Sequence, residues 1–198
     1  MSDRQTAILV LAAGESKRMG VAKQLLPYRG TTLLGHCLQT ALSTHIGKVY
    51  CVLGAHFSKT IAVVQNFPAV QLVHNEDWQL GMGSSISVGV KSILSDIPEV
   101  GHVLIMLADQ PFMNVAYLAK MFEAAVEEEG IVVATKYADA PGVPAIFPSA
   151  VFEKLSGLNG ESGAKKLIMS YPKVVSVTRG DRYLLDVDTE DDYQIIIG

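Results

Sequence analysis

A loop rich in glycine and cationic residues is the first part of the sequence that could do chemistry. The residues Leu11-Ala12-Ala13-Gly14-Glu15-Ser16-Lys17-Arg18-Met19-Gly20 follow an apolar run, and Lys23 comes three residues later. Small residues let a backbone approach a ligand closely, and glycines permit a tight turn. Free backbone N–H groups beside several cations are typical of a phosphate site. The alternative is an ordinary strand-to-helix turn whose cations are solvated.

The spacing of this loop excludes two common phosphate motifs. The P-loop requires G-x-x-x-x-G-K-[ST]. Here five residues separate Gly14 from Gly20, and Val21 follows where that motif has lysine. The dinucleotide fingerprint G-x-G-x-x-G fails as well, because the loop lacks its other glycines.

Two acidic segments could hold a cation. Asp109 follows the apolar run Val103–Ala108, and Leu185-Asp186-Val187-Asp188 lies near the end of the chain. A carboxylate at the end of a buried strand is costly unless it is paired or binds a cation. A turn cap before Pro111 is the alternative for Asp109, and a helix N-terminus would also suit the second segment. Alternation along a strand would send Asp186 and Asp188 to the same side.

Short apolar runs alternate with amphipathic segments and must position these loops. We expect eight strands, at Ala7–Ala12, Val49–Leu53, Val70–His74, Val103–Ala108, Ile131–Thr135, Val143–Phe147, Val174–Thr178 and Tyr183–Val187. Several of these runs lack strict alternation, which is typical of strands buried on both faces. Helical spacing is found at 33–42, 86–94, 118–126 and 164–168, with Gly130 expected to cap the third of these segments. Thr189 and Asp192 predict the capping box of a last helix.

This alternation predicts a single domain over residues 1–198 with a Rossmann-like, three-layer α/β/α fold and a mostly parallel sheet. From Ala138 onward the pattern is less regular, which is compatible with a change of strand order. Ligands of such sheets bind beyond the carboxyl ends of the strands. The phosphate-like loop and Asp109 both follow predicted strands, so we expect them at one edge of the sheet.

Composition narrows the class of protein. The 198 residues are 49% hydrophobic and 18% charged, with a net charge of −4. This length allows a core that needs no disulfide or structural metal, and the mild acidity argues against general nucleic-acid binding. The apolar runs, of about six residues, are far shorter than the roughly 20 residues of a membrane helix. Without a signal-peptide pattern, and with both cysteines in apolar patterns, the sequence predicts a soluble cytoplasmic protein with no membrane partner.

The first loop belongs to a longer signature. The pattern Leu-Ala-Ala-Gly-x-Ser-x-Arg-Met-Gly-x-x-Lys, continuing into Leu25-Leu26-Pro27-Tyr28-Arg29-Gly30, resembles the MobA-like nucleotidyltransferases. These enzymes attach a nucleoside monophosphate to a phosphorylated acceptor. The chain is most similar to the molybdenum cofactor cytidylyltransferase branch, and the resemblance extends from Ile8 to Tyr193. It includes a second loop, from Asn75 to Ser85, in which Trp78 is expected to be a packing anchor.

The resemblance implies roles for individual residues. It implies catalytic roles for Arg18 and Lys23, which would neutralise the triphosphate. It implies Mg²⁺ as the cofactor, with Asp109 and Asp188 as ligands. It implies nucleotide binding by Leu11, Ala12, Ala13, Gly14, Glu15, Ser16, Lys17, Arg18, Met19, Gly20, Lys23, Asn75, Gly81, Met82, Ser85 and Asp109.

Two later segments resemble the acceptor side of the family. They are Pro141-Gly142-Val143-Pro144 and the run 158–166, from which Gly142, Pro144, Gly163 and Lys165 are implied to bind the acceptor. Relatives often have histidine in place of Val143. They also often read Gly-Asp-x-Gly-Ala-Arg where this chain reads Gly-Glu-Ser-Gly-Ala-Lys at 160–165. Lysine in place of arginine loses a two-pronged contact with phosphate, so these departures concern the acceptor more than the nucleotide.

The implied reaction is transfer of CMP from CTP to the phosphate of a molybdopterin-type cofactor, with release of pyrophosphate. A phosphate nucleophile is largely ionised at neutral pH and needs no general base. Guanylyl-transferring relatives commonly read Leu-Ala-Gly-Gly, so Ala13 favours CTP over GTP on steric grounds. The alternatives are guanylyl transfer, cytidylyl transfer to another phosphorylated small molecule, or a non-catalytic chaperone that holds the cofactor or nucleotide for a molybdoenzyme partner.

Overall fold

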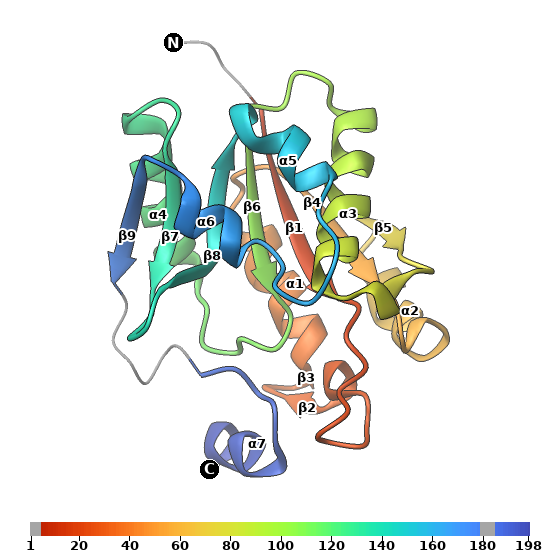
Figure 1. The fold of residues 1–198 in the computed structure, drawn as a ribbon. Coiled ribbons are helices and arrows are strands. Elements are labelled where there is room, and N and C mark those ends of the chain that lie inside the picture. Colours follow the sequence, from red (N-terminus) through yellow and green to blue (C-terminus); the bar gives the residue numbers. More distant parts are fainter. Residues whose placement is uncertain (1–4, 179–184) are drawn as a thin grey trace.

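The chain folds around one seven-stranded sheet. Figure 1 shows a computed structural model, in which residues 5–178 and 185–198 are described. The strand order is β5-β4-β1-β6-β8-β7-β9. The strands are β1 (Thr6–Ala12), β4 (Lys48–Leu53), β5 (Val70–His74), β6 (His102–Leu107), β7 (Val132–Lys136), β8 (Pro141–Pro148) and β9 (Val174–Thr178). All neighbours are parallel except β8, which is antiparallel to both β6 and β7.

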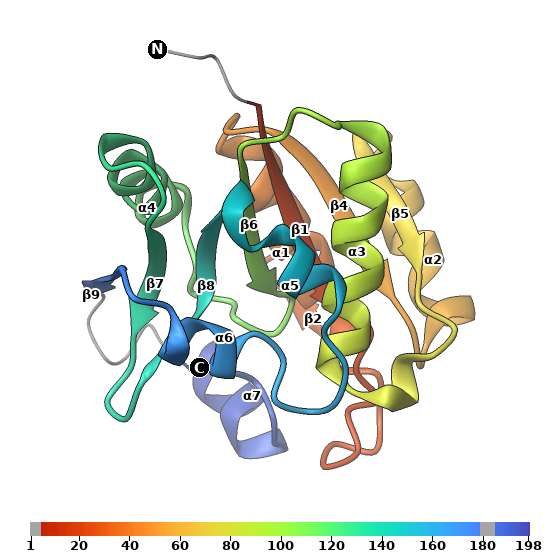
Figure 2. The same ribbon diagram turned by 45° about the horizontal axis from the view of Figure 1, so that its top comes forward.

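Helices cover both faces of this sheet and make three layers, as the two views in Figures 1 and 2 show. The helices α1 (Leu33–Ser43), α2 (Phe57–Gln65) and α4 (Val115–Glu127) pack on one face. The helices α3 (Met82–Asp96), α5 (Phe152–Ser156) and α6 (Lys165–Ser170) pack on the other. The predicted α/β/α fold with a mostly parallel sheet is confirmed.

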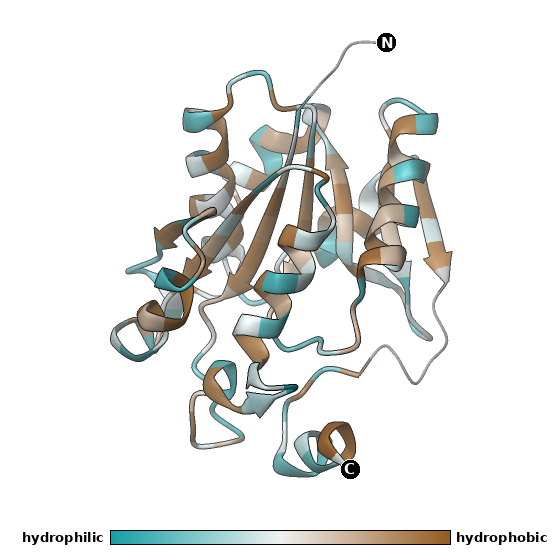
Figure 3. Ribbon diagram, turned by 180° about the vertical axis from the view of Figure 1, so that it is seen from behind, coloured by the Kyte–Doolittle hydropathy of each residue, from teal (hydrophilic) through white to brown (hydrophobic). Residues whose placement is uncertain are grey.

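Strand β1 explains why the predicted strands lack a polar face. Its side chains alternate between the two hydrophobic clusters: Ile8 and Val10 face α1, while Leu9 and Leu11 face α3. Every residue of this strand is buried, so both faces must be apolar. Seen from behind, the central strands are largely brown, whereas the helices over them alternate between teal and brown segments (Figure 3).

A small third cluster lies below the carboxyl edge of the sheet, where Figure 1 shows the ladder β2 (Pro27–Tyr28) and β3 (Thr31–Thr32) close to helix α7 (Glu190–Ile197). Tyr28 and Val187 are its buried members, together with Leu33. The Tyr193 hydroxyl donates a hydrogen bond of 2.7 Å to the Pro27 carbonyl. Helix α7 begins with the predicted capping box of Thr189 and Asp192.

Two expectations about elements are wrong. Residues 183–184 of the eighth predicted strand lie outside the described residues, and 185–188 form no strand. That segment is instead held by the Val187 N–H, which donates to the Asp109 carbonyl over 2.9 Å, and by the start of α7. Gly130 does not cap α4, because the helix ends at Glu127 and its C-cap is Glu128.

Several elements were not predicted. They are helices α2 and α5, the β2–β3 ladder, and three short 3₁₀ helices at Lys23–Leu25, Trp78–Leu80 and Ser149–Val151. Among the described residues, no helix has the length and apolar character needed to cross a membrane. Cys37 and Cys51 are buried free thiols, which agrees with their place in apolar patterns.

Candidate active site

A cavity of about 580 Å³ opens at the carboxyl ends of β1 and β6. Five segments far apart in the sequence meet there: the loop after β1, the loop before α3, the residues after β6, the loop between α5 and α6, and the stretch preceding α7. Its walls are formed by Leu11, Ala12, Ala13, Gly14, Glu15, Ser16, Lys17, Arg18, Lys23, Gln24, Trp78, Gln79, Gly81, Met82, Ser85, Leu107, Ala108, Asp109, Glu161 and Asp188. The position agrees with the expectation that ligands bind beyond the carboxyl ends of the strands.

In the loop after β1, the carbonyl oxygens of residues 12–14 accept hydrogen bonds from other groups of the protein. The Gln24 amide nitrogen donates to the Ala12 and Gly14 carbonyls over 3.1 and 2.8 Å. The Ala13 carbonyl accepts from the Ala55 N–H over 3.1 Å. Within the described residues, the N–H groups of 14–18 make no backbone hydrogen bond. The loop therefore keeps a run of donors available for an anion.

Gln24 is a site residue that the sequence reading missed. Its side chain is buried, on the short 3₁₀ helix after the loop, and it lines the cavity. The backbone of Lys23 is fixed in the same region, where its N–H donates to the Ser16 hydroxyl over 3.3 Å. Ser16 itself has a φ of 59°, a left-handed conformation that tightens the turn.

The second loop is held by a buried amide. The Asn75 side chain donates to the hydroxyls of Ser84 and Ser85, each over 2.9 Å, and accepts from the Asp77 N–H over 3.1 Å. Asn75 does not itself line the cavity, whereas Ser85 does. Asn75 is thus placed to position the start of α3.

The acceptor-like segment packs directly on this second loop through main-chain atoms. The Gly83 N–H donates to the Gly160 carbonyl over 2.9 Å, and the Gly160 N–H donates to the Leu80 carbonyl over 2.8 Å. Gly81 has a φ of 95°, and a Cβ on it would lie 2.5 Å from the Gly160 carbonyl carbon. This contact brings Glu161 into the cavity wall.

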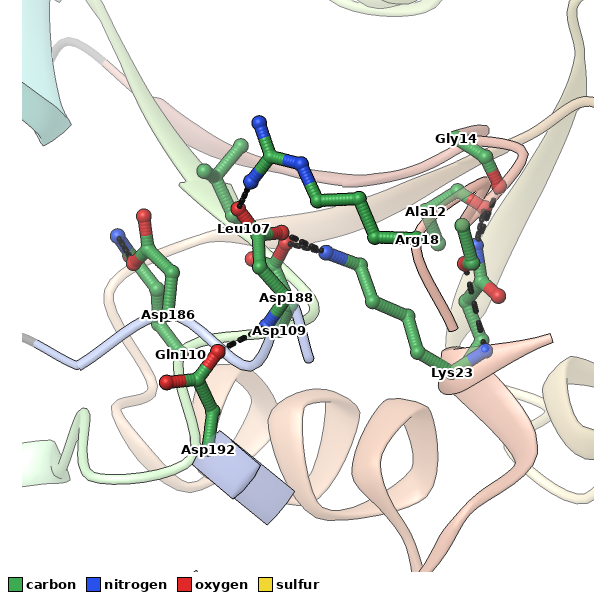
Figure 4. Close-up of polar contacts among 12 residues, drawn as sticks. Ala12, Gly14, Arg18, Lys23, Leu107, Asp109, Gln110, Asp186, Asp188 and Asp192 are labelled. Atoms are coloured by element: carbon green, nitrogen blue, oxygen red, sulfur yellow. Dashed lines mark hydrogen bonds and ion pairs between the residues drawn. The ribbon is translucent and has the colours of Figure 1, made fainter. Parts of the chain in front are cut away.

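Four charged side chains meet at the other side of the cavity (Figure 4). The Lys23 ammonium lies 2.6 Å from Asp109 Oδ2 and 2.8 Å from Asp188 Oδ1. Arg18 Nη1 lies 2.9 Å from Asp188 Oδ2. The Lys23 and Asp109 side chains are only 13% and 18% exposed, so their attraction is weakly screened by solvent.

This cluster changes the ionisation of the lysine. Burial alone would lower the pKa of Lys23, but its attraction to Asp109 and the hydrogen bond it donates to that carboxylate, with smaller contributions from Asp188, raise that pKa above its ordinary value. Lys23 therefore stays charged between the two carboxylates. The second oxygen of Asp109, Oδ1, is buried without a hydrogen-bond partner among the described residues.

The residue after Asp109 ties the C-terminal segment to the sheet. The buried Gln110 amide donates to Asp186 Oδ1 and to the Tyr137 hydroxyl, each over 2.9 Å. Burial, with the nearby charge of Asp109, raises the pKa of Asp186 to about 6. The Asp186 carboxylate thus contacts Gln110, whereas that of Asp188 contacts the two cations. We expected the two side chains on the same side of a strand, but residues 185–188 form no strand, so that expectation is wrong.

Most of the expected nucleotide residues line the cavity, but Met19, Gly20 and Asn75 do not. The four residues implied for the acceptor lie outside its walls as well. Gly142 faces the Tyr137 ring, the Pro144 carbonyl accepts from Thr135 over 2.8 Å, Gly163 packs against Met82, and Lys165 is exposed. Besides Gln24, the cavity contains Trp78, Gln79, Leu107, Ala108 and Glu161, which were not assigned to the site. Trp78 also packs against the core, as expected of an anchor.

The carboxylates suit a hard divalent cation. Asp109 and Asp188 offer oxygen ligands close together, and Asp109 Oδ1 is a buried acceptor without a donor. Over 5–178 and 185–198, no group of three or more histidine, cysteine or acidic side chains is arranged around one metal position. Magnesium sites commonly use one or two carboxylates and complete the shell with substrate phosphates and water. The pair therefore fits such an ion.

Comparison with known proteins agrees with this geometry. The MobA-like NTP transferase domain matches residues 8–174. The purine catabolism protein PucB of Bacillus subtilis is 30% identical over 94% of this chain and 93% of its own. The nicotine blue oxidoreductase of Paenarthrobacter nicotinovorans is 30% identical over 85% of this chain and 84% of its own. The molybdenum cofactor cytidylyltransferase of Escherichia coli is more distant, at 22% over 93% of this chain and 92% of its own.

Solved structures show the same fold. Rv0371c of Mycobacterium tuberculosis H37Rv superimposes with a TM-score of 0.85 and 34% identity, covering 99% of this chain and 98% of the other. Its complex with manganese matches with a TM-score of 0.75 and 31% identity, covering 97% of each chain. The family match spans most of the chain and includes the first loop, Asp109 and the strands that position them. The chain belongs to the MobA-like NTP transferase family.

Proposed function

We propose that this protein transfers CMP from CTP to the phosphate of a molybdopterin-type cofactor and releases pyrophosphate. The observation that carries the proposal is the meeting of a cationic, donor-rich loop with two carboxylates at one cavity. That combination suits a substrate that is both polyanionic and cation-bound. Family membership supports nucleotidyl transfer in general, and the choices of base and acceptor belong to the proposal.

The chain supplies alignment and charge neutralisation. The N–H groups of residues 14–18 bind the triphosphate, and Arg18 and Lys23 neutralise it. An oxygen of the acceptor phosphate attacks the α-phosphorus, and the bond from that phosphorus to pyrophosphate breaks. The acceptor phosphate is already ionised, so no side chain has to remove a proton. The proposed mechanism therefore needs neither a side-chain nucleophile nor a general base.

Asp109 and Asp188 would hold the magnesium ion. When bound, that ion would supply further neutralisation of the phosphates. Asp109 Oδ1 would gain a partner, since it has none in the described residues. The manganese complex of Rv0371c supports a divalent cation in this family.

The proposal of CTP depends on Ala13. Ala13 lines the cavity, and its methyl group lies against Gly54, where an added Cβ would be only 2.8 Å from it. A methyl group there reduces the room for a purine, although one such group is worth only about 1–3 kcal/mol of discrimination. GTP is therefore the second nucleotide to test. Molybdopterin is favoured as acceptor by the relationship to the Escherichia coli cytidylyltransferase.

A redox function is the second candidate, because one relative at 30% identity is named an oxidoreductase. The first loop does not favour it, since the loop lacks the dinucleotide fingerprint. The two functions differ in the ligand that stabilises the protein. A dinucleotide would be expected to raise the melting temperature under the redox hypothesis, and a triphosphate with Mg²⁺ under ours.

The first experiment is thermal unfolding with CTP, GTP, ATP, UTP and NADPH, each with and without Mg²⁺. A ligand at 100 times its Kd adds about 2.7 kcal/mol to stability, which gives a clear rise in melting temperature. We expect the largest Mg²⁺-dependent rise with CTP. Pyrophosphate release from CTP on addition of molybdopterin then tests the acceptor. A larger rise with GTP would contradict the role of Ala13, and release only with a different phosphorylated compound would contradict the acceptor.

A further inference from the structure

We propose that Lys23 occupies the divalent-cation position between Asp109 and Asp188 until a triphosphate draws it away, so that nucleotide and cation bind cooperatively. The inference deepens the proposed function, on which it rests for the identity of the triphosphate. It concerns the order in which charges are exchanged at the site.

The geometry is that of a placeholder. A single ammonium group contacts both carboxylates, at 2.6 Å on Asp109 and 2.8 Å on Asp188. No surface lysine among the described ion pairs bridges two acids in this way: Lys17 contacts only Glu15, and Lys48 only Asp96. A cation that binds to both carboxylate groups must therefore displace the lysine or share its position.

Charge balance explains why the lysine is there. Asp109 and Asp188 together carry two negative charges, and like charges this close oppose each other's ionisation. Lys23 and Arg18 supply two positive charges, which balance these two carboxylates without any ligand. A divalent cation at the same position would lie against the Lys23 ammonium, and repulsion between the two cations favours departure of the lysine.

A triphosphate reverses this balance. Lys23 lies in the wall of the same cavity as the donor loop 14–18, so a phosphate bound to that loop competes with the carboxylates for the ammonium. Once Lys23 turns to the phosphate, two carboxylates remain that again require positive charge. The cation then binds at the position that Lys23 has left. By linkage, cation binding must favour nucleotide binding by the same factor.

Arg18 has a different place in the cluster. It contacts only Asp188, and its side chain is 72% exposed against 13% for Lys23. A guanidinium at the surface can move without leaving a buried carboxylate unpaired, whereas Lys23 cannot. The exchange is therefore assigned to Lys23.

The test measures binding of Mn²⁺ alone to the full chain, with no nucleotide, from the electron paramagnetic resonance signal of the free ion. We expect Lys23→Met to bind Mn²⁺ about tenfold more tightly than wild type, within the roughly 5- to 150-fold range of coupled sites. Lys23→Arg keeps the cation and should stay near the wild-type affinity. Lys17→Met removes a cation from the same loop that touches neither carboxylate, and it is the matched control.

The double variant Lys23→Met/Asp109→Asn shows where the ion binds. The gain in Mn²⁺ affinity should disappear in it. An unchanged affinity in Lys23→Met, an equal gain in Lys17→Met, or a gain that survives Asp109→Asn would each overturn the inference.

A second measurement uses the wild-type protein and needs no variant to fold. The rate at which each lysine is acetylated by an amine-reactive reagent is followed by mass spectrometry, with and without saturating Mn²⁺. Displacement from the carboxylates should increase the acetylation rate of Lys23 and leave that of Lys17 unchanged. An unchanged rate at Lys23 would show that the cation does not displace it. None of these readouts requires an acceptor, so a failure to transfer CMP would leave the result intact.

Discussion

Asp109 is the residue at which the proposed chemistry and the observed packing meet. Asp109→Asn preserves size but removes the charge that contacts Lys23 and would hold the cation. We expect the rate of pyrophosphate release to fall by about 10²-fold or more, since charge stabilisation is lost where the phosphates react. Asp96→Asn, which removes an acid paired with Lys48 on the surface, should leave the rate unchanged. Full activity in Asp109→Asn would refute the metal role of this residue.

A second prediction concerns Gln24, whose side chain holds the backbone of the loop after β1. Gln24→Leu removes the donor of the Ala12 and Gly14 carbonyls. We expect the free energy of unfolding to fall by about 1–3 kcal/mol, the cost of leaving buried acceptors unsatisfied. Affinity for the triphosphate should fall as well, because the loop loses its arrangement. Gln65→Leu, at an exposed position on α2, is the control for both the denaturant titration and the binding measurement.

At the residue scale, the sequence identified the groups that carry charge but not those that hold them in place. Lys23 and Asp109 were expected from their types and from the resemblance. Gln24 looks like a spacer between a lysine and a leucine, and nothing in its neighbours indicates that its amide reaches back to Ala12. The contact of Lys23 with both acids required the fold, since Asp188 lies far along the chain.

A third prediction concerns the contact between the loop before α3 and the loop before α6. Gly81→Ala would place a methyl group 2.5 Å from the Gly160 backbone at a φ of 95°. Gly130→Ala imposes a similar φ, 75°, with no atom within 4 Å. The control should therefore lose about 1–2 kcal/mol from backbone strain alone. The free energy of unfolding of Gly81→Ala should fall further, and its nucleotide affinity should fall too. Equal losses of unfolding free energy in the two variants would mean that the contact between Gly81 and the Gly160 backbone adds nothing to stability.

Most elements follow from periodicity, and the exceptions have physical causes. Helix α2 contains Thr60, Ile61, Val63 and Val64, whose β-branched side chains disfavour a helix, and no side chain caps its start. Packing of Ile61 and Val64 on the core overrides that preference. The segment 185–188 has the composition of a strand, but its Val187 N–H bonds the Asp109 carbonyl beyond the end of the sheet.

The whole molecule is divided between a large framework and a small C-terminal unit. Neither major cluster contains a residue of α7, whose contacts are with the β2–β3 region. A chain that ends at Thr178 should therefore still unfold cooperatively, at a lower temperature because Tyr28 and Leu33 lose their cover. It should no longer gain stability from CTP with Mg²⁺, since Asp188 is missing. Loss of a cooperative transition in calorimetry would contradict this division.

The order of the strands in the sheet could not be predicted from the sequence. Alternating strands and helices predicted parallel pairing, but β8 inserts antiparallel between β6 and β7. Its apolar residues are buried like those of its parallel neighbours, so hydrophobicity alone does not report its direction. The irregular pattern after Ala138 was the available sign of this change.

The main-chain contact between Gly83 and Gly160 has a consequence for how substrate preference can be altered. Two loops that touch through backbone atoms have no side chains with which to absorb a change in shape. Exchanging one of them with the corresponding loop of a relative would leave a gap or a collision against the other. Chimeras between members of this family should therefore retain activity when 78–85 and 158–163 are transplanted together, and lose it when either is moved alone.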